Sequence, residues 1–201
     1  MVSFLISMIV LINPFALFVY LVPVMQDIPR SDFFKVLFKS TLISLLIYFV
    51  FSQFGEFIFS RIFSINFESF RIFGGIVIFI MALVFIIQGK KSFITLKGSL
   101  DDLASEIAMP FLVGASTIAI SILIGKKYSA VKATLIIILA LAINFATIAV
   151  LVFIKDALPS QRLKIAFDKL MGYFLRINGF LVGAIGIDMT IRGIRHVLAE
   201  F

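Results

Sequence analysis

Long apolar runs separated by short charged stretches make up most of this chain of 201 residues. A membrane-crossing helix needs about 20 mostly apolar residues. Six runs approach or exceed that length, over approximately residues 3–25, 36–58, 71–88, 103–124, 131–154 and 173–194. The pattern therefore predicts an all-α integral membrane protein with six transmembrane helices. A β-barrel fits less well, because its strands alternate apolar and polar residues, whereas residues 135–142 are continuously non-polar.

The composition excludes most other classes of protein. Hydrophobic residues make up 62% of the chain and charged residues 14%, against about 25% charged in soluble domains. A soluble enzyme and a disordered chain are both excluded. The apolar runs leave no room for a second domain, so residues 1–201 form one transmembrane domain.

Little in the sequence suggests catalysis, a metal or a cofactor. The chain has no cysteine, and its one histidine, His196, lies near the C-terminus. There is no phosphate-binding glycine loop, and the acidic run Asp101, Asp102 and Glu106 is more simply a solvated loop. We expect neither an enzyme nor a bound cofactor or metal. The net charge of +7 lies in short loops beside apolar runs, which favours contact with lipid over binding of nucleic acid.

Basic residues favour one side of the predicted bundle. Loops after the first, third and fifth helices hold 11 of the 18 Lys and Arg residues, and the opposite side holds 7. Cytoplasmic loops are the more basic ones. The bias predicts a multi-pass plasma-membrane protein with both termini outside the cytoplasm.

Two of the six predicted helices contain helix breakers. Pro14 follows Asn13 in the middle of the first run, and Pro110 and Gly114 interrupt the fourth. Proline removes a backbone donor and clashes with the preceding turn. Either a kink or a broken, re-entrant helix results. Because the two breaks lie at matching places in the two halves, a broken, re-entrant helix is favoured in each.

The two halves of the chain resemble each other in the order of their features. Pro14 and Pro110 lie 96 positions apart, and each begins an apolar stretch that ends in a basic loop. Arg71 and Arg176 each start the third helix of a half and precede a glycine by three positions. These matches predict two repeats, over approximately residues 1–89 and 103–195. Three helices per half make the second copy inverted, which is typical of secondary transporters.

Two broken helices related in this way should meet near the membrane midplane. Each break exposes amides at one half-helix N-terminus and carbonyls at the other half's C-terminus. Such a site suits a small zwitterion. Its candidate substrate-binding residues are those at the breaks, together with one asparagine in the fifth helix: Asn13, Pro14, Phe15, Pro110, Gly114, Ser116, Thr117 and Asn144. Capping, back-bonding to the preceding turn and interhelical hydrogen bonds are the structural alternatives.

Asp188 is the acidic residue that falls well inside a predicted helix. Intramembrane carboxylates are rare, and they are usually paired or functional. One hypothesis is an ion-coupling site for a proton or sodium. The alternative is an ion pair with Arg192, one helical turn away.

Arginines and glycines on the third and sixth helices have simpler interpretations. Arg71 and Arg176 are best explained as interfacial anchors; a gating ion pair with Glu68 or Asp168 is the alternative. Small residues allow helices to approach closely in lipid, and this is the expected role of Gly74, Gly75, Gly179, Gly183 and Gly186.

The chain resembles the MarC family, which is grouped with small neutral amino acid transporters and placed near the LysE exporter superfamily. The resemblance spans nearly the whole chain, and no single motif is as specific as a zinc site. Its carrying segments are residues 13–15, 71–75, 107–114, 176–179 and 185–193. It implies a transporter or exporter of small neutral amino acids such as glycine and alanine.

The chain also departs from the family pattern. Ala16 and Val19 stand where the family tends to have glycine and proline, Ala115 and Ser116 follow Gly114 in place of Pro-Gly, and Asp188 replaces a glutamine. These differences bear on the substrate more than on the fold.

Three functions therefore compete. A secondary transporter of a small amino-acid-like solute leads. A channel or passive facilitator would show flux that does not saturate, and a membrane scaffold would bind no solute. An oligomer is compatible with each.

Overall fold

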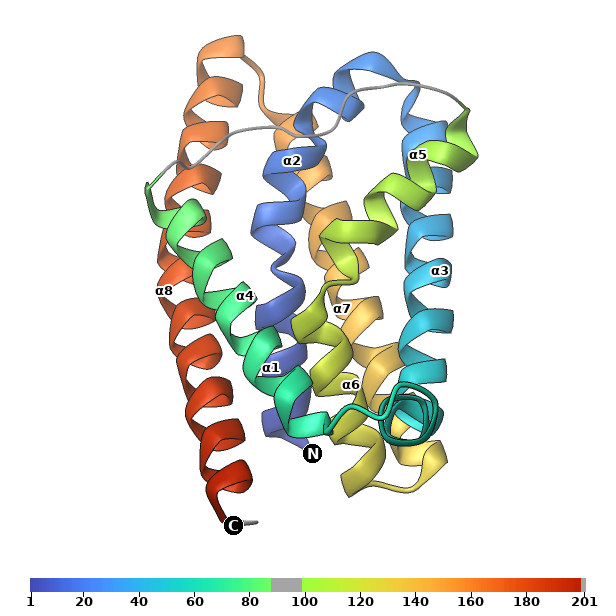
Figure 1. Cartoon of the computed structure of the whole chain (residues 1–201). Helices are drawn as coiled ribbons and strands as arrows, with labels where there is room; N and C mark the ends of the chain where they lie inside the picture. The colour runs from blue at the N-terminus through green and yellow to red at the C-terminus, as the bar shows by residue number, and fades with distance from the viewer. Residues whose placement is uncertain (88–98, 200–201) are drawn as a thin grey trace.

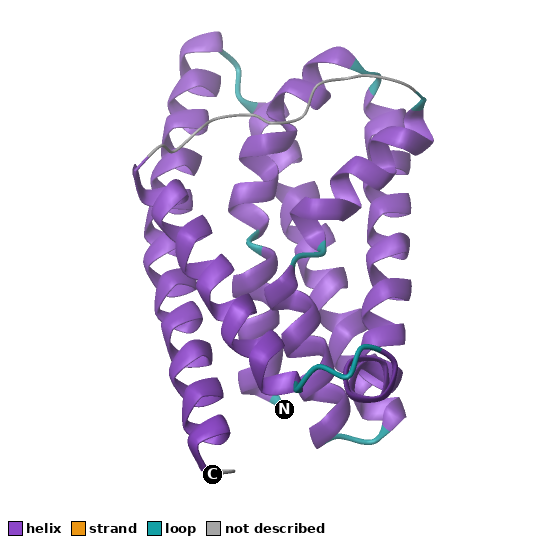
Figure 2. Ribbon diagram, in the orientation of Figure 1, coloured by secondary structure: helices purple, strands orange, loops and turns teal. Residues whose placement is uncertain are grey.

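The computed structural model describes residues 1–87 and 99–199, and this part of the chain is helical with no strand in it (Figures 1 and 2). In chain order the α-helices are α1 (Val2–Ile12), α2 (Pro14–Asp27), α3 (Arg30–Phe57), α4 (Phe67–Ile87), α5 (Leu100–Glu106), α6 (Ala115–Lys127), α7 (Ala130–Ala157) and α8 (Gln161–Ala199). Two π-helical segments, η1 (Ile58–Ile62) and η2 (Ile107–Leu112), follow α3 and α5. The predicted basic stretch with Lys90, Lys91 and Lys97 lies outside the described residues.

Five stretches among the described residues are long and apolar enough to cross a membrane. They are Val2–Asp27, Arg30–Ile62, Phe67–Ile87, Ala130–Ala157 and Gln161–Ala199. The predicted all-helical membrane class is thus confirmed. The predicted fourth crossing is not among the five, because residues 100–127 are divided into α5, η2 and α6.

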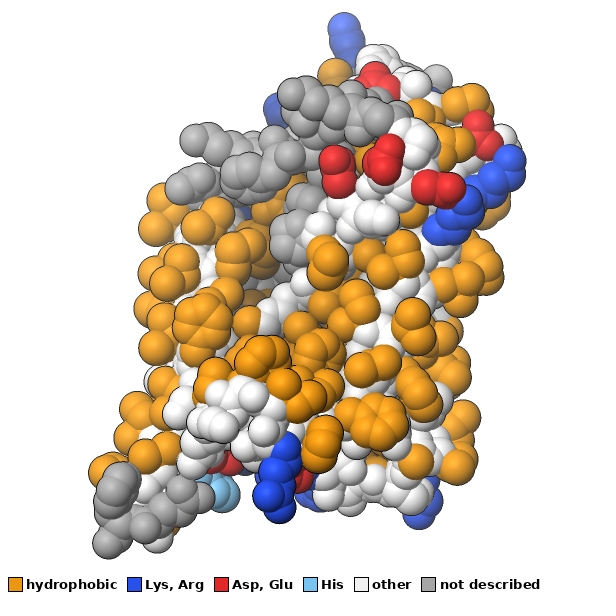
Figure 3. Space-filling model, turned by 45° about the vertical axis from the view of Figure 1, so that its right-hand side comes forward, with side chains coloured by type: hydrophobic (Ala, Val, Ile, Leu, Met, Phe, Trp, Pro, Cys, Tyr) orange, Lys and Arg blue, Asp and Glu red, His pale blue; other side chains and the backbone are white. Residues whose placement is uncertain are grey.

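The surface agrees with a membrane setting. On the face drawn in Figure 3, hydrophobic side chains cover the middle of the molecule, and charged side chains gather toward its two ends. Large apolar side chains such as Leu46, Phe73 and Phe180 are more than half exposed, at 64%, 57% and 64%. Both termini lie at the same end of the bundle (Figure 1).

Two helices begin earlier than the hydrophobic pattern predicts. The second predicted helix was placed at residue 36, but α3 begins at Arg30, directly after Pro29. The sixth was placed at residue 173, but α8 begins at Gln161. The polar start of α8 is held by tertiary contacts, since Lys155 pairs with Asp168 at 2.9 Å and Phe167 meets Phe18 edge to face. Hydropathy alone does not register such contacts.

The first break is the one that the sequence predicts. Asn13 adopts the left-handed conformation, with φ 55° and ψ 75°, and separates α1 from α2. Pro14 then occupies the first position of α2, where its missing N–H has no intrahelical partner to lose.

The second break involves both of the predicted helix breakers, Pro110 and Gly114. Met109 is extended, with φ −124° and ψ 122°, as expected for a residue that precedes a proline. The chain leaves the helix fully only at Val113 and Gly114, after η2. Asn13 and Val113, which directly follow α1 and η2, lie 100 positions apart.

Burial repeats along the chain with the same spacing. The buried residues Val36, Leu37, Ser40, Ser44 and Tyr48 of α3 each have a buried residue of α7 exactly one hundred positions later, namely Ile136, Ile137, Ala140, Asn144 and Ile148. Between α4 and α8 the spacing is 104, since Phe67, Arg71, Gly75, Ile78, Ala82 and Phe85 match Met171, Leu175, Gly179, Val182, Gly186 and Met189.

The proposed equivalence of the two arginines does not hold. Arg71 is buried, at 8% exposure, and its Nη1 lies 3.2 Å from the Glu68 carboxylate. Arg176 is exposed on α8, and Leu175 matches Arg71 in burial. A one-residue shift turns a helical side chain by about 100° around the axis, which explains how a sequence match can fail in three dimensions.

Glycines bring α4 and α8 together as predicted. A Cβ added to Gly75 would lie 2.6 Å from the Gly186 carbonyl oxygen, and one added to Gly186 would lie 2.7 Å from the Gly75 carbonyl oxygen. The two helices thus approach backbone to backbone, as small residues permit.

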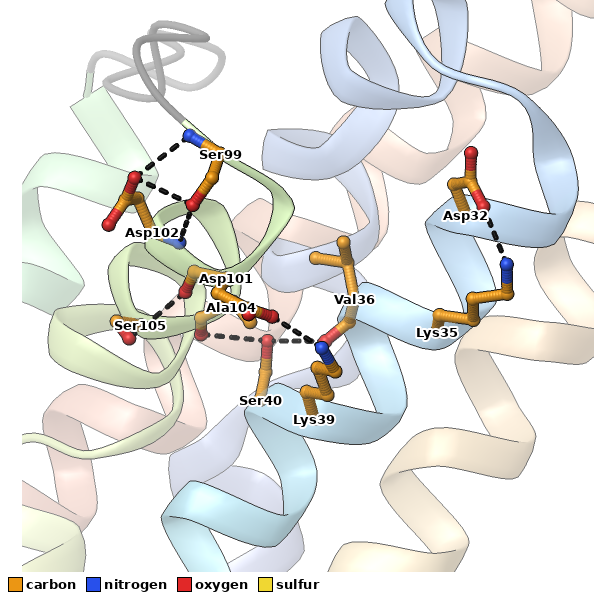
Figure 4. A network of polar contacts seen from close by, with 10 residues as sticks. All are labelled: Asp32, Lys35, Val36, Lys39, Ser40, Ser99, Asp101, Asp102, Ala104 and Ser105. Carbon is orange, nitrogen blue, oxygen red and sulfur yellow. Dashed lines mark hydrogen bonds and ion pairs between the residues drawn. The ribbon is translucent and has the colours of Figure 1, made fainter.

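Polar contacts fasten α5 to α3 (Figure 4). The Ser40 hydroxyl is 2.8 Å from the Val36 carbonyl oxygen and 2.9 Å from that of Ala104, and Lys39 pairs with Asp101. Ser99 caps α5, and its backbone N–H and hydroxyl donate to Asp102. These bonds hold the pKa of the Asp102 carboxyl below its ordinary value. The start of the second broken segment is therefore fixed to the bundle.

Candidate functional site

The two breaks meet at an internal cavity of about 360 Å³. Both appear in Figure 2 as short loops inside the bundle. The lining residues come from both broken segments, from α4 and from α8: Leu11, Ile12, Asn13, Ala16, Leu17, Tyr20, Val77, Ile78, Met81, Phe85, Leu112, Gly114, Ala115, Ser116, Thr117 and Val182. None of these described lining residues is charged. The volume lies within the range of small-molecule sites, about 300–1,000 Å³.

Asn13 is the most informative residue of this cavity. Its left-handed backbone ends α1, and its Oδ1 accepts a hydrogen bond of 3.0 Å from the Ala16 N–H at the start of α2. The side chain is only 2% exposed, yet Nδ2 has no hydrogen-bond partner in the protein. A buried, unpaired amide costs about 1–3 kcal/mol. Asn13 thus holds an unpaired amide donor beside the cavity.

The start of α6 forms the opposite polar wall. Thr117 Oγ1 accepts a hydrogen bond of 2.9 Å from the Gly114 N–H and lies 3.0 Å from the Gly114 carbonyl oxygen. For Thr117, local bonding to the preceding turn was the structural alternative to ligand contact, and this is the arrangement found. Ser116 lines the cavity and is partly exposed. Because Thr117 Oγ1 is engaged in capping, the Ser116 hydroxyl is the more available of the two for contact with a ligand.

Other predicted site residues lie elsewhere. Phe15 turns toward α8 and stacks on Phe174, with ring centroids 5.3 Å apart. Pro14 is buried at the start of α2 and is not among the lining residues. Pro110 lies in η2, and its side chain is outside the described part of the structure. The structure thus brings Asn13, Gly114, Ser116 and Thr117 together, without Pro14 and Phe15.

Asn144 and Asp188 are both separate from the cavity lining. Asn144 is buried in α7 at 1% exposure, with no hydrogen-bond partner for either amide atom. Asp188 is not buried: its side chain is 56% exposed and lies 2.8 Å from Nε of Arg192. The ion pair that the sequence leaves as the alternative is the arrangement found. This placement gives no support to a coupling role.

The structure adds site residues that the sequence does not single out. Val77, Met81 and Phe85 recur every four positions and line the cavity from one face of α4. Tyr20 also lines the cavity and packs against Phe85, with ring centroids 6.3 Å apart. The spacing shows that the three α4 residues share a face, but no sequence signal separates that face from the lipid-facing ones.

Tyr48 supports the second break from outside the cavity. Its hydroxyl donates a hydrogen bond to the carbonyl of Leu112, the last residue of η2. Tyr48 is fully buried in α3. A broken helix leaves carbonyls without intrahelical donors, and this one is satisfied by a neighbouring helix.

A second cavity of about 300 Å³ lies where α2 ends and α8 begins. Its charges are largely paired, since Arg30 lies 2.7 Å from Asp156 and Lys155 lies 2.9 Å from Asp168. Arg30 also lies over the Phe153 ring, 4.3 Å from its centroid. This cavity lies at an end of the bundle, outside the region of the breaks.

The fold and the first cavity define a multi-span helical membrane protein with interrupted helices around an uncharged internal site. Comparison with known families identifies the family to which the chain belongs. The chain belongs to the MarC family of integral membrane proteins, which it matches over residues 1–198. The resemblance seen in the sequence is thereby confirmed.

Two curated relatives match nearly the full length. A UPF0056 membrane protein of Methanocaldococcus jannaschii is 25% identical and covers 94% of this chain and 92% of its own. A UPF0056 membrane protein of Pyrococcus horikoshii is 22% identical, with 92% and 89% covered. No solved structure matches the chain. The names of these relatives state membrane location and no solute.

Proposed function

We propose that this protein is a secondary transporter of small neutral amino acids, and not an enzyme. The observation that carries the proposal is the cavity at which both helix breaks meet, with the buried and unpaired Nδ2 of Asn13 at its wall. Non-helical backbone at membrane depth is tolerated where it is buried in protein or lines a water-filled cavity. Two such segments at one cavity are more than a packed bundle needs.

The half-helix termini suit a zwitterion. α2 and α6 both begin at the cavity, where the dipole is positive and the first N–H groups lack intrahelical acceptors. α1 and η2 both end there, at Ile12 and Leu112, where carbonyl dipoles favour positive charge. In our proposal the Asn13 amide and the amides of α6 bind the carboxylate, while carbonyl oxygens face the ammonium.

Transport in this proposal rests on an inverted repeat of six crossings. In addition to the five apolar stretches, the segment from α5 to α6 forms one more crossing, the fourth in chain order. Both termini lie at one end of the bundle, which supports an even number of crossings. The burial matches at spacings of 100 and 104 support two related halves. Movement of one half against the other would open the cavity to each side in turn.

Orientation follows from the basic residues. The end that holds Arg30, Lys35, Lys155 and Lys164 is placed in the cytoplasm of the plasma membrane, so that both termini face outward. The lipid bilayer is the partner in this arrangement. An ion gradient, of protons or sodium, would drive accumulation.

The test is uptake of labelled amino acids into proteoliposomes that contain the purified protein. We expect saturable uptake that responds to an imposed proton or sodium gradient. A channel would give flux that does not saturate and ignores both gradients. A scaffold would give no uptake and no stabilisation by any amino acid, because a ligand stabilises only the state that binds it. Either of the last two results contradicts the proposal.

A further inference from the structure

We infer that the preferred solutes are neutral amino acids with an apolar side chain larger than that of alanine, such as leucine or methionine. The inference rests on the proposed function and concerns the same cavity. Glycine and alanine are what the family resemblance suggests, and the shape of the cavity departs from that expectation.

The first argument is size. The cavity of about 360 Å³ is well above what one or two water molecules need. Alanine has six non-hydrogen atoms and would leave much of it empty. Leucine and methionine, each with nine, leave less of the wall without a contact. Unfilled space next to apolar side chains forfeits packing energy.

The second argument is the division of the cavity into a polar and an apolar end. Apart from Tyr20, its polar lining residues and its one glycine, Asn13, Gly114, Ser116 and Thr117, lie at the two breaks. Tyr20 lies seven residues beyond Asn13 on α2, which corresponds to about 10 Å along a helix. Its ring packs against that of Phe85, and Met81 lies one turn earlier on α4.

A zwitterion bound at the breaks would therefore direct its side chain toward Tyr20, Met81 and Phe85. Leu17, Ile78 and Val182 line the space between the two ends. No described lining residue is charged, so a charged side chain would be desolvated there without a partner. Each methylene buried at this end should strengthen binding about fourfold.

The experiment is competition for uptake in proteoliposomes, with labelled alanine and labelled leucine each tested against glycine, alanine, valine, leucine, methionine and lysine. We expect leucine and methionine to inhibit half-maximally at concentrations at least tenfold below those for alanine, and lysine not to inhibit. Met81→Ala should reduce the advantage of leucine over alanine at least threefold. Phe85→Ala should act in the same direction.

Phe79→Ala is the matched control, because Phe79 lies on α4, is 37% exposed and lines an outer groove instead of the cavity. It should leave every value unchanged. If glycine and alanine are taken up and leucine competes no better than they do, the size inference fails and the proposed function stands. If no labelled amino acid enters the vesicles under either gradient, the proposed function fails, and the inference fails with it.

Discussion

At the scale of single residues, Asn13 combines three properties that rarely coincide. It holds a left-handed backbone, caps α2 through Oδ1 and leaves Nδ2 buried and unpaired beside the cavity. Asparagine tolerates the left-handed region better than most residues. The first two properties serve the fold, and the third serves no contact within the protein.

These roles can be separated by two substitutions. Asn13→Gly keeps the left-handed conformation, and loss of the cap to glycine costs only a few tenths of a kcal/mol. We expect it to fold with nearly unchanged Tm and to lose most amino acid uptake. Asn13→Ala should also lose stability, by about 1–2 kcal/mol, because alanine is strained in this conformation. Thermal unfolding and uptake of both variants distinguish the roles, and normal uptake by the glycine variant would remove Asn13 from the site.

Asp188 is expected to be dispensable for transport. Its carboxylate pairs with Arg192 on an exposed part of α8, away from the cavity lining. Asp188→Asn should therefore retain gradient-driven uptake. Uptake that no longer responds to the gradient in this variant would restore the coupling role that the sequence suggests.

At the scale of helices, the contact between α4 and α8 depends on the absence of side chains. Gly75→Ala would place a Cβ 2.6 Å from the Gly186 carbonyl oxygen, so the helices must move apart. Overpacking of this kind costs about 1–3 kcal/mol. We expect a clear fall in Tm.

Gly114→Ala is the control for this prediction. It makes the same chemical change at a position where the nearest atom, Oγ of Ser116, is 3.8 Å away and the backbone is in an ordinary extended conformation. Its free energy of unfolding should remain within about 0.5 kcal/mol of the parent value, the usual range for sites without special constraints. Equal losses in the two variants would show that close packing is not what Gly75 provides.

The second break depends on α3 through Tyr48. Tyr48→Phe removes the hydroxyl that donates to the Leu112 carbonyl, so this buried carbonyl loses one of its hydrogen bonds. Thr117 Oγ1, at 3.3 Å, remains as a second donor. We expect a loss of about 1–2 kcal/mol, toward the lower part of the range for a buried unsatisfied group. Tyr173→Phe, at a residue that is 61% exposed on α8, should have no effect on thermal unfolding.

The sequence predicts the helices and their breaks better than it predicts the site. Hydrophobic runs and helix breakers are local signals, and they located α1, α2, α4 and α7 within a few residues. The polar starts of α3 and α8 were missed, because they depend on contacts between helices. The bond from Tyr48 to Leu112 joins residues 64 positions apart, and no local pattern contains it. Asn13 was predicted because a breaker lies next to it, whereas Tyr20 and Phe85 have no such marker.

At the scale of the whole molecule, the testable property is its orientation. The chain contains no cysteine, so a single introduced thiol reports its own side of the membrane. Ser129, between α6 and α7, and Ser160, between α7 and α8, are exposed and lie at opposite ends of α7. We expect Ser129→Cys to react with a membrane-impermeant maleimide in intact cells, and Ser160→Cys to react only after the cells are opened. The reverse pattern would show that the termini face the cytoplasm.

The matched burial of α3 and α7 does not extend to the chemistry of the two breaks. Position 48 is tyrosine and position 148 isoleucine, while position 13 is asparagine and position 113 valine. Asn13 caps the first break from within its own segment, whereas the second break is held both by Thr117 of its own segment and by Tyr48 of α3. A substitution that loosens one break therefore has no equivalent at the other, so the two breaks should respond to mutation independently.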